Sequence, residues 1–382
     1  MNYNTDAIKP LKVLHITPNR LIPGDFNHSA FYIWRSLAKG FTEYHVAGRS
    51  TENKDCSFRE NNLSVHLLAS RLNTHSEFLF TQYWVHTLAE KIQPDIVVCQ
   101  CPVLGGLEAC RIARDYGAKL LFEFHSADLY FGKQSLLSKN MLLQMITRKT
   151  LRKADKIRVL SKGMKEALLA TYGASFSENI VVLPPRVDME KFKIAKKDYT
   201  IHGHARLVIV GSINNRKGQL QLLQALDFVK FDIELWLVGT GPDEDACKLF
   251  VKKASLENHV RFYGQLTHSE LAELLPQADI MVQFSKDEGM PRTIMEGMAA
   301  GLPVITTNAG YCCDVVINGV TGFVLGDDPS VEINIRLKEL IAAQSFREAM
   351  GRAGRHRAEI EFEAVSHFIR YRQLISSLVD NR

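Results

Sequence analysis

Short apolar runs alternate with amphipathic stretches from one end of the chain to the other. In the first half, apolar residues recur at helical spacing in 30–39, 80–92 and 107–116. The runs that we interpret as strands cover 12–17, 44–48, 95–99, 119–124, 157–161 and 180–183. Strands buried on both faces appear as continuous apolar runs, so this alternation predicts a parallel sheet with helices on both sides.

The pattern restarts after a break at Pro184-Pro185 and a polar, lysine-rich stretch over 189–204. The second series of expected strands is 206–211, 234–239, 259–263, 279–284, 303–306 and 322–325. We therefore predict an α/β protein with two Rossmann-like, doubly wound domains, at 1–190 and 191–364, and a C-terminal helix at about 365–382 that packs on the first. Such sheets bind ligands beyond the carboxyl ends of their strands, so we expect the domains to face a central cleft.

Composition narrows the class of protein without identifying it. The chain has 382 residues, of which 46% are hydrophobic and 23% charged. It contains no apolar run near the eighteen residues that span a bilayer and no N-terminal secretory signal, which predicts a cytoplasmic protein. The seven cysteines follow no zinc or disulfide spacing, so we interpret them as structural.

The segment from Asp287 to Pro303 carries the most chemistry. Pro291 suits the first turn of a helix and Gly301 its end, so the backbone amides at the helix start are available to an anion. Glu288 and Glu296 lie eight residues apart around this start, and carboxylates accept hydrogen bonds from vicinal hydroxyls. The alternative is that Glu288 caps the helix and Glu296 is a solvated surface residue.

A family resemblance favours the first interpretation. After Glu288 and Glu296 come Gly-Leu-Pro-Val-Ile-Thr at 301–306, Gly310, and Asn-Gly-Val-Thr-Gly-Phe at 318–323. This order resembles the retaining glycosyltransferases of family 4, which have two Rossmann domains in the GT-B arrangement. The resemblance implies a hexosyltransferase-type enzyme that uses a nucleotide diphosphate sugar as substrate and needs no cofactor and no metal.

The resemblance also implies a role for each residue of the motif. Glu288 would hold a hydroxyl of the donor sugar, and Glu296 the ribose hydroxyls. The backbone amides of Gly289, Met290 and Pro291 would line the sugar and phosphate. The stretch 261–264, with Arg261 and Tyr263, would border the base.

A basic turn, Arg216-Lys217-Gly218, follows the expected strand 206–211. Two cations at a strand end can stabilise a departing diphosphate without a metal, whereas a basic turn can also be merely solvated. The family resemblance favours phosphate binding. The family usually has arginine where this chain has Ser212, and Arg216 is the candidate to replace that charge.

Two further site residues are expected in the first domain. His125 follows the strand 119–124 and matches the active-site histidine of the family, which faces the donor sugar. Gly24 lies near the N-terminus where the family often has a glycine pair that positions acceptor or phosphate. By contrast, Asp243-Glu244-Asp245 only looks like a metal motif, because acidic residues are favoured at a helix start.

The segment 133–165 contains ten lysines and arginines and one acid, Asp155. An apolar stretch at 141–146 precedes Arg148-Lys149 and Arg152-Lys153, a pattern that can bind anionic lipid or form a buried helix with a solvated basic side. Expected partners are therefore the nucleotide-sugar donor, a saccharide or lipid-linked acceptor and an anionic membrane surface, with no nucleic acid. Peripheral association with the cytoplasmic face of the membrane would follow.

We interpret the chain as a transferase in bacterial-type surface polysaccharide or glycolipid assembly. Two alternatives stay open. One is a nucleotide-sugar 2-epimerase of the same fold, which would convert its donor without an acceptor. The other is a degenerate transferase acting as a partner subunit, which the substitution at Ser212 keeps in view.

Overall fold

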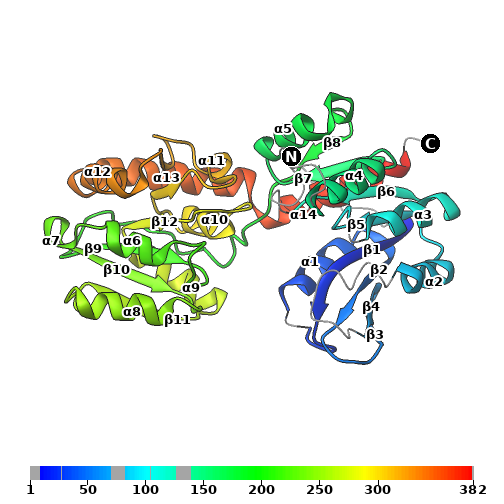
Figure 1. Cartoon of the computed structure of the whole chain (residues 1–382), viewed down its shortest axis with the longest axis horizontal. Helices are drawn as coiled ribbons and strands as arrows, with labels where there is room; N and C mark the ends of the chain where they lie inside the picture. The colour runs from blue at the N-terminus through cyan, green and yellow to red at the C-terminus, as the bar shows by residue number, and fades with distance from the viewer. Residues whose placement is uncertain (1–8, 27, 70–81, 104, 126–138, 381–382) are drawn as a thin grey trace. The chain divides into compact units, whose positions relative to one another are not determined.

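The computed structural model describes residues 9–26, 28–69, 82–103, 105–125 and 139–380. The chain divides into two compact units. Unit 1 comprises Met1–Leu183 and Phe368–Arg382, and unit 2 comprises Pro184–His367. Each is an α/β unit built on its own sheet (Figure 1).

Unit 1 contains eight strands in one sheet, with the order β3-β4-β2-β1-β5-β6-β7-β8. Its elements are β1 (Lys9–Leu21), α1 (Ser29–Ala38), β2 (Phe41–Ser50), β3 (Cys56–Glu60), β4 (Leu63–Leu68), α2 (Gln82–Ile92), β5 (Ile96–Cys99), α3 (Gly106–Tyr116), β6 (Lys119–Glu123), α4 (Lys139–Leu151), β7 (Lys156–Val159), α5 (Lys162–Tyr172), the 3-10 turn η2 (Ala174–Phe176) and β8 (Ile180–Val182).

The sheet of unit 1 is parallel except for β3, which pairs antiparallel with β4. Sequence analysis missed both of these strands. In β3, half-buried and exposed residues alternate, so it lacks the continuous apolar run that we used to find strands. The six strands that were predicted in this half are all confirmed, with ends that differ by a few residues.

Unit 2 contains six strands in the order β11-β10-β9-β12-β13-β14. Its elements are β9 (Ala205–Val210), α6 (Gln219–Ala225), α7 (Phe228–Phe231), β10 (Ile233–Val238), α8 (Glu244–Lys253), β11 (Val260–Gly264), α9 (His268–Leu274), the 3-10 turn η3 (Leu275–Gln277), β12 (Ile280–Gln283), α10 (Arg292–Ala299), β13 (Val304–Thr307), α11 (Cys312–Val315), β14 (Gly322–Leu325), α12 (Pro329–Ala342) and α13 (Gln344–Glu361).

All five strand pairings of unit 2 are parallel, and the order reverses direction between β9 and β12. Both faces of this sheet are buried. Along β9, Val208 and Val210 belong to one apolar cluster, whereas Leu207 and Ile209 belong to the other. The continuous apolar runs in the sequence therefore arise from helices that cover both faces, and the reversal point is where such sheets bind ligands.

The last helix, α14 (Ala364–Asp380), crosses the division of the chain. Its first four residues belong to unit 2, and from Phe368 onward it belongs to unit 1. In unit 1, the Arg372 guanidinium donates a 2.9 Å hydrogen bond to the carbonyl of Ser36 on α1. Within the described ranges, no helix has the length and apolar character needed to cross a membrane.

Candidate active site

The carboxylate of Glu288 lies in the loop after β12 and is held by three donors. Lys217 Nζ lies 2.5 Å from Glu288 Oε1, Ser285 Oγ donates to the same oxygen at 2.7 Å, and Gln283 Nε2 at 2.8 Å. The Glu288 side chain is 5% exposed and that of Lys217 is 14% exposed. No described residue donates to Glu288 Oε2, so one oxygen is fully occupied and the other remains able to accept.

Two glycines allow the loops to approach closely enough for this pairing. Gly218, in the turn after β9, has φ +72°, and an added Cβ would lie 2.1 Å from the carbonyl oxygen of Phe284. Gly310 has φ +55°, and an added Cβ would lie 1.6 Å from the carbonyl oxygen of Glu288. Any side chain at either position would push the Glu288 loop away, because backbone atoms cannot yield as a flexible side chain can.

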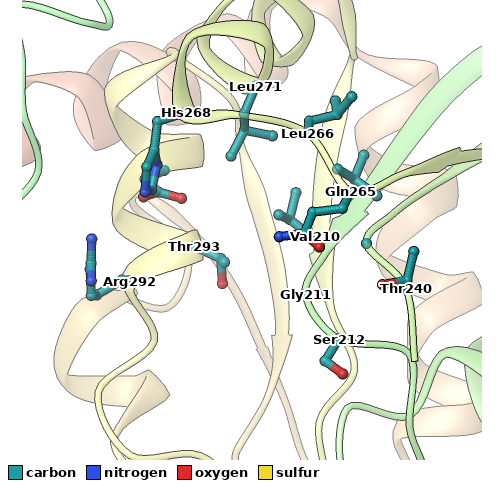
Figure 2. Close-up of a pocket in the computed structure, with 13 residues that line it drawn as sticks. Val210, Gly211, Ser212, Thr240, Gln265, Leu266, His268, Leu271, Arg292 and Thr293 are labelled. Atoms are coloured by element: carbon teal, nitrogen blue, oxygen red, sulfur yellow. The ribbon is translucent and has the colours of Figure 1, made fainter. Parts of the chain in front are cut away.

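A pocket of about 480 Å³ opens beside this pair, at the carboxyl ends of β9, β10 and β11. In Figure 2, Arg292 and Thr293 come from the start of α10 on one side, while Gln265 and Leu266 line the other. The full lining is Val210, Gly211, Ser212, Val238, Gly239, Thr240, Gln265, Leu266, His268, Leu271, Arg292, Thr293 and Glu296.

The pocket and the Glu288 pair are physically connected. Thr293 lines the pocket and donates a 3.2 Å hydrogen bond to Gln283, whose amide in turn donates to Glu288. On the other side, the stem of Lys217 lies over Gly211, since an added Cβ there would be 3.6 Å from Lys217 Cε. The pocket wall is therefore connected to Glu288 by hydrogen bonds and to Lys217 by contact.

Glu296 contributes the second carboxylate. It is buried on α10, lines the pocket and lies 3.7 Å from the Nδ1 of His268. Burial raises the pKa of Glu296 above its ordinary value, and Arg292 and Lys191 oppose this rise. Burial also lowers the pKa of His268. A buried carboxylate that faces a pocket is stabilised by any ligand that donates hydrogen bonds to it.

The start of α10 offers backbone donors next to these side chains. Pro291 is the N-cap residue and provides no side-chain cap, so the helix begins one residue later than predicted. The first amides of α10 therefore have no partner from the cap side chain and can bind an anion. Of the other residues predicted to line the sugar and phosphate, the Gly289 carbonyl accepts from the Tyr311 amide, and Met290 packs against the core.

The structure brings some of the predicted residues of unit 2 together and separates others. Ser212 is exposed and lines the pocket. Arg216 is exposed, and its carbonyl accepts from the Lys286 amide. Arg261 and Tyr263 do not line this pocket: Arg261 pairs with Glu234 of β10, and the Tyr263 ring packs 5.5 Å from that of Trp236. Gln265 and Leu266, which follow β11, occupy the pocket wall instead.

Sequence analysis missed several residues of the site. Arg292 and Thr293 are part of the segment that we singled out, but a pattern of glutamates and glycines gave them no role. Gln283 and Ser285 were also overlooked. A signal was present, because Gln283 is a polar residue at the end of an otherwise apolar buried strand, and such a residue needs a hydrogen-bonding partner.

In unit 1, His125 follows the end of β6 and its side chain is 45% exposed. Its Nε2 lies 3.4 Å from Oε2 of Glu123, a carboxylate that is only 1% exposed. Gly24 lies in an exposed turn after β1, with φ +78° and its carbonyl accepting from the Phe26 amide. Gly24 therefore allows the left-handed backbone conformation of this turn.

Glu123 is the centre of a buried polar cluster in unit 1. Its Oε1 accepts from Arg158 Nη1 at 2.7 Å and from the hydroxyl of Tyr371 on α14. On the other side, Oε2 faces His125 and, at 4.0 Å, the Nε2 of His15. Burial alone would raise the pKa of Glu123, but Arg158 and the two histidines hold it well below the ordinary value. Glu123 is therefore an ionised, buried carboxylate.

The acidic residues 243–245 lie at the start of α8, which confirms their interpretation as a helix start. Asp243 is the N-cap residue and Glu244 pairs with Lys248 at 2.7 Å within the helix. In the part of the chain that the structure describes, no group of three or more histidine, cysteine, aspartate or glutamate side chains is arranged to hold a metal ion.

Two family models together span residues 29–357. The model for glycosyltransferase family 4 matches residues 29–191, and the model for glycosyl transferases group 1 matches residues 190–357. The putative glycosyltransferase EpsD of Bacillus subtilis is 26% identical over 352 residues, which cover 87% of this chain and 90% of that protein. Some other relatives are matched over 51% to 58% of their own length.

Solved structures show the same fold. Sucrose-phosphate synthase from Thermosynechococcus elongatus has a TM-score of 0.79 at 19% identity, covering 97% of this chain and 100% of that chain. Anabaena Alr3699/HepE in complex with UDP has a TM-score of 0.74 at 17% identity, covering 96% and 100%. With two Rossmann-like units, the paired glutamates and both family models, the chain belongs to the GT-B glycosyltransferases of family 4.

Proposed function

We propose that this glycosyltransferase uses a nucleotide diphosphate sugar as donor, retains the anomeric configuration and needs no metal ion. The observation that carries the proposal is the Lys217–Glu288 pair beside a pocket that also holds Glu296. The pair supplies a cation for a diphosphate and a carboxylate for a sugar hydroxyl, and the pocket supplies a second carboxylate for the ribose diol.

The charges suggest how a donor is held. In the free protein, Lys217 is neutralised by Glu288. When a diphosphate enters, Lys217 turns to it together with the amides at the start of α10, and the released Glu288 accepts from the donor sugar. Arg292 adds a permanent positive charge in the pocket wall, where Ser212 contributes none. Gln265 and Leu266 are then the residues placed to border the base.

The proposed chemistry follows from this arrangement. The acceptor hydroxyl approaches the anomeric carbon on the face from which the diphosphate departs, and a diphosphate oxygen takes its proton. The C–O bond to the diphosphate breaks as the bond to the acceptor forms, so the configuration is retained without a protein nucleophile. Lys217 and the α10 amides stabilise the charge that develops on the leaving group. By family resemblance, we assign His125 of unit 1 a hydrogen bond to a substrate hydroxyl.

The acceptor is proposed to be a saccharide or lipid-linked hydroxyl in surface polysaccharide or glycolipid assembly, reached from the cytoplasmic face of a membrane. Support comes from α4, where Leu142 is 57% exposed and Met145 60%. Lys149 continues the same side of the helix, seven residues after Leu142 and four after Met145, and Arg152 and Lys153 follow directly after the helix ends at Leu151. Exposed apolar residues followed by cations suit an anionic lipid surface.

A donor screen tests the proposal. Thermal shifts are measured with UDP-, GDP- and ADP-sugars, with and without a chelator, since a ligand at 100 times its Kd stabilises by ~2.7 kcal/mol. We expect one donor series to raise the Tm in the presence of chelator, and NMR of the product to show the anomeric configuration of the donor. Conversion of the donor without an acceptor would indicate the epimerase instead, and an inverted product would rule out retention.

A further inference from the structure

The buried carboxylate of Glu123 does more than form an ion pair with Arg158. Its two oxygens have different partners: Oε1 accepts from Arg158 and Tyr371, and Oε2 faces the imidazole of His125. Arg158 is itself fixed, because it also donates to the carbonyl of Leu183 and lies 4.4 Å from the Tyr371 ring centroid. The orientation of Glu123 is therefore set by side chains that are themselves buried.

An ionised carboxylate can only accept hydrogen bonds. The contact of 3.4 Å between Glu123 Oε2 and His125 Nε2 thus requires the proton on Nε2 when the imidazole is neutral. Within the described residues nothing bonds to Nδ1 of His125. Since the side chain is 45% exposed, Nδ1 is the nitrogen left as an acceptor for a ligand.

A second histidine near Glu123 Oε2, the buried His15, shows why His125 is the one that can act on a ligand. His15 Nδ1 lies 2.7 Å from the hydroxyl of Tyr44, and its Nε2 is buried without a hydrogen-bond partner, 4.0 Å from Glu123 Oε2. Oε2 therefore has two imidazole nitrogens near it and is closer to that of His125. Only His125 reaches the protein surface, so it is the histidine whose tautomer can affect a ligand.

We propose that Glu123, held by Arg158 and by Tyr371 from α14, is a positioning residue that keeps the proton of neutral His125 on Nε2 and presents Nδ1 to a hydroxyl of the substrate. The kinetic part of this inference rests on the proposed function, in which His125 contacts a substrate hydroxyl. The structural part concerns one tautomer in unit 1 and stands independently of any donor.

The decisive measurement is the tautomer of His125 in the full-length protein. Histidine side chains are labelled with 15N, long-range 1H–15N correlations are recorded, and the His125 signals are identified by their absence in His125→Gln. Wild type should show the proton on Nε2. A proton on Nδ1 in the wild type would overturn the proposal without any variant.

Glu123→Gln sharpens the test, because its amide nitrogen can donate toward His125 while its oxygen keeps Arg158 and Tyr371. The tautomer should invert to Nδ1–H, and kcat should fall about 10-fold, the scale expected when one hydrogen bond to the substrate is lost, with donor KM changed less than about 3-fold. Tyr371→Phe keeps the ring over Arg158 and should lower kcat about 2- to 10-fold, the equivalent of one hydrogen bond.

Tyr172→Phe is the matched control, since Tyr172 is a buried tyrosine of α5 that does not bond to Glu123. It should leave tautomer and kcat unchanged. Wild-type tautomer and wild-type kcat in Glu123→Gln would overturn the positioning role. If wild type itself converts no donor, the proposed function fails, and the tautomer measurement still decides the assignment of Glu123.

Discussion

Each unit of the protein contains a buried carboxylate near the carboxyl end of a parallel strand, and the two are held in opposite ways. Glu288 of unit 2 receives all three of its donors on Oε1, one of them a lysine ammonium on a flexible stem. Glu123 of unit 1 has partners on both oxygens, including a buried arginine. The first arrangement can exchange a partner for a ligand, whereas the second cannot without losing a buried ion pair.

We infer from this difference that Glu288 binds ligand, whereas Glu123 supports the site. Both glutamates are equally buried, at 5% and 1% exposed, so burial alone does not distinguish them. The two glutamates are distinguished by the number of unoccupied acceptor positions on the carboxylate and by the flexibility of the side chain that carries the cation. The following predictions test whether Glu123 maintains the fold and the position of His125 while Glu288 serves the substrate.

The largest effect should come from Arg158→Met, which leaves the Glu123 carboxylate buried without its cation. Breaking a buried pair from one side costs about 3–5 kcal/mol of unfolding free energy. Hydrogen exchange should show the loss in β6 and β7 of unit 1, with the β9 amides of unit 2 unchanged. Lys217→Met is the counterpart in unit 2 and should cost clearly less, because Ser285 and Gln283 remain on Glu288.

When turnover is measured in place of stability, Lys217→Ala should have a larger effect than Arg158→Met. Loss of one charge-stabilising contact lowers turnover by ~10²–10³, and we expect the Tm to change little. Initial rates with the donor found by the screen provide the measurement, and Lys286→Ala, another lysine of this loop region that bonds to Asn215, is the control. Wild-type turnover in Lys217→Ala would remove Lys217 from the site.

Gly310→Ala tests the backbone support of Glu288 without changing its side chain. The added methyl would meet the Glu288 carbonyl, so the loop must move and both stability and donor binding should fall. Gly319→Ala is the matched control, since Gly319 has φ +78° and nothing within 4 Å of an added Cβ. The control should lose only the ~1–2 kcal/mol of a left-handed non-glycine residue, and equal losses in both variants would contradict the role of close approach.

Mild acid should weaken unit 1 relative to unit 2. Burial lowers the pKa of His15 from 6.5 to about 4, so the unfolded chain binds the proton more readily and stability is lost as the pH falls from 6.5 toward 4. The lowered pKa of Glu123 acts in the same direction at lower pH. In unit 2, the lowered pKa of His268 also acts in this direction, but the raised pKa of Glu296 opposes it. Hydrogen exchange at pH 7 and pH 5 should show β1 losing more protection than β9.

The smallest effect is expected at Arg261, which sequence analysis assigned to the base. Its side chain is 66% exposed and pairs with Glu234 away from the pocket lining, so Arg261→Ala should change stability by ~0–1 kcal/mol and leave donor affinity nearly unchanged. Gln265→Ala should weaken binding measurably in the same titration. A larger loss in Arg261→Ala than in Gln265→Ala would restore the sequence-based assignment.

The sequence predicted the strands of unit 2 well, and the strongest signals were the uninterrupted apolar runs within β9, β10 and β12. The family resemblance singled out Glu288 and Glu296, and the structure shows that both carboxylates are buried. The sequence could not predict that Lys217 and Glu288 would pair, since they are 71 residues apart and meet only because β9 and β12 are neighbours in the sheet. Likewise, nothing in Arg216-Lys217 indicated that one side chain would turn inward and the other outward.

The Glu123 cluster shows a second limit of the sequence. Glu123 stands two residues before His125, yet its partners come from three other parts of the chain: Arg158, Tyr371 and His15. The hydrophobic pattern of the sequence does not indicate that a carboxylate next to an exposed histidine will be buried. The two missed strands have other causes. β3 has no continuous apolar run, and β4 is mostly buried but its apolar residues are interrupted by Ser64 and His66.

The division of the chain within α14 sets an order for biosynthesis. A ribosome delivers Tyr371 248 residues after Glu123, when the whole of unit 2 has already been made. Until then, Glu123 and Arg158 of the nascent unit 1 lack their contact with Tyr371. Unit 2, continuous from 184 to 367, can therefore fold to completion before unit 1, although residues 1–183 of unit 1 emerge earlier.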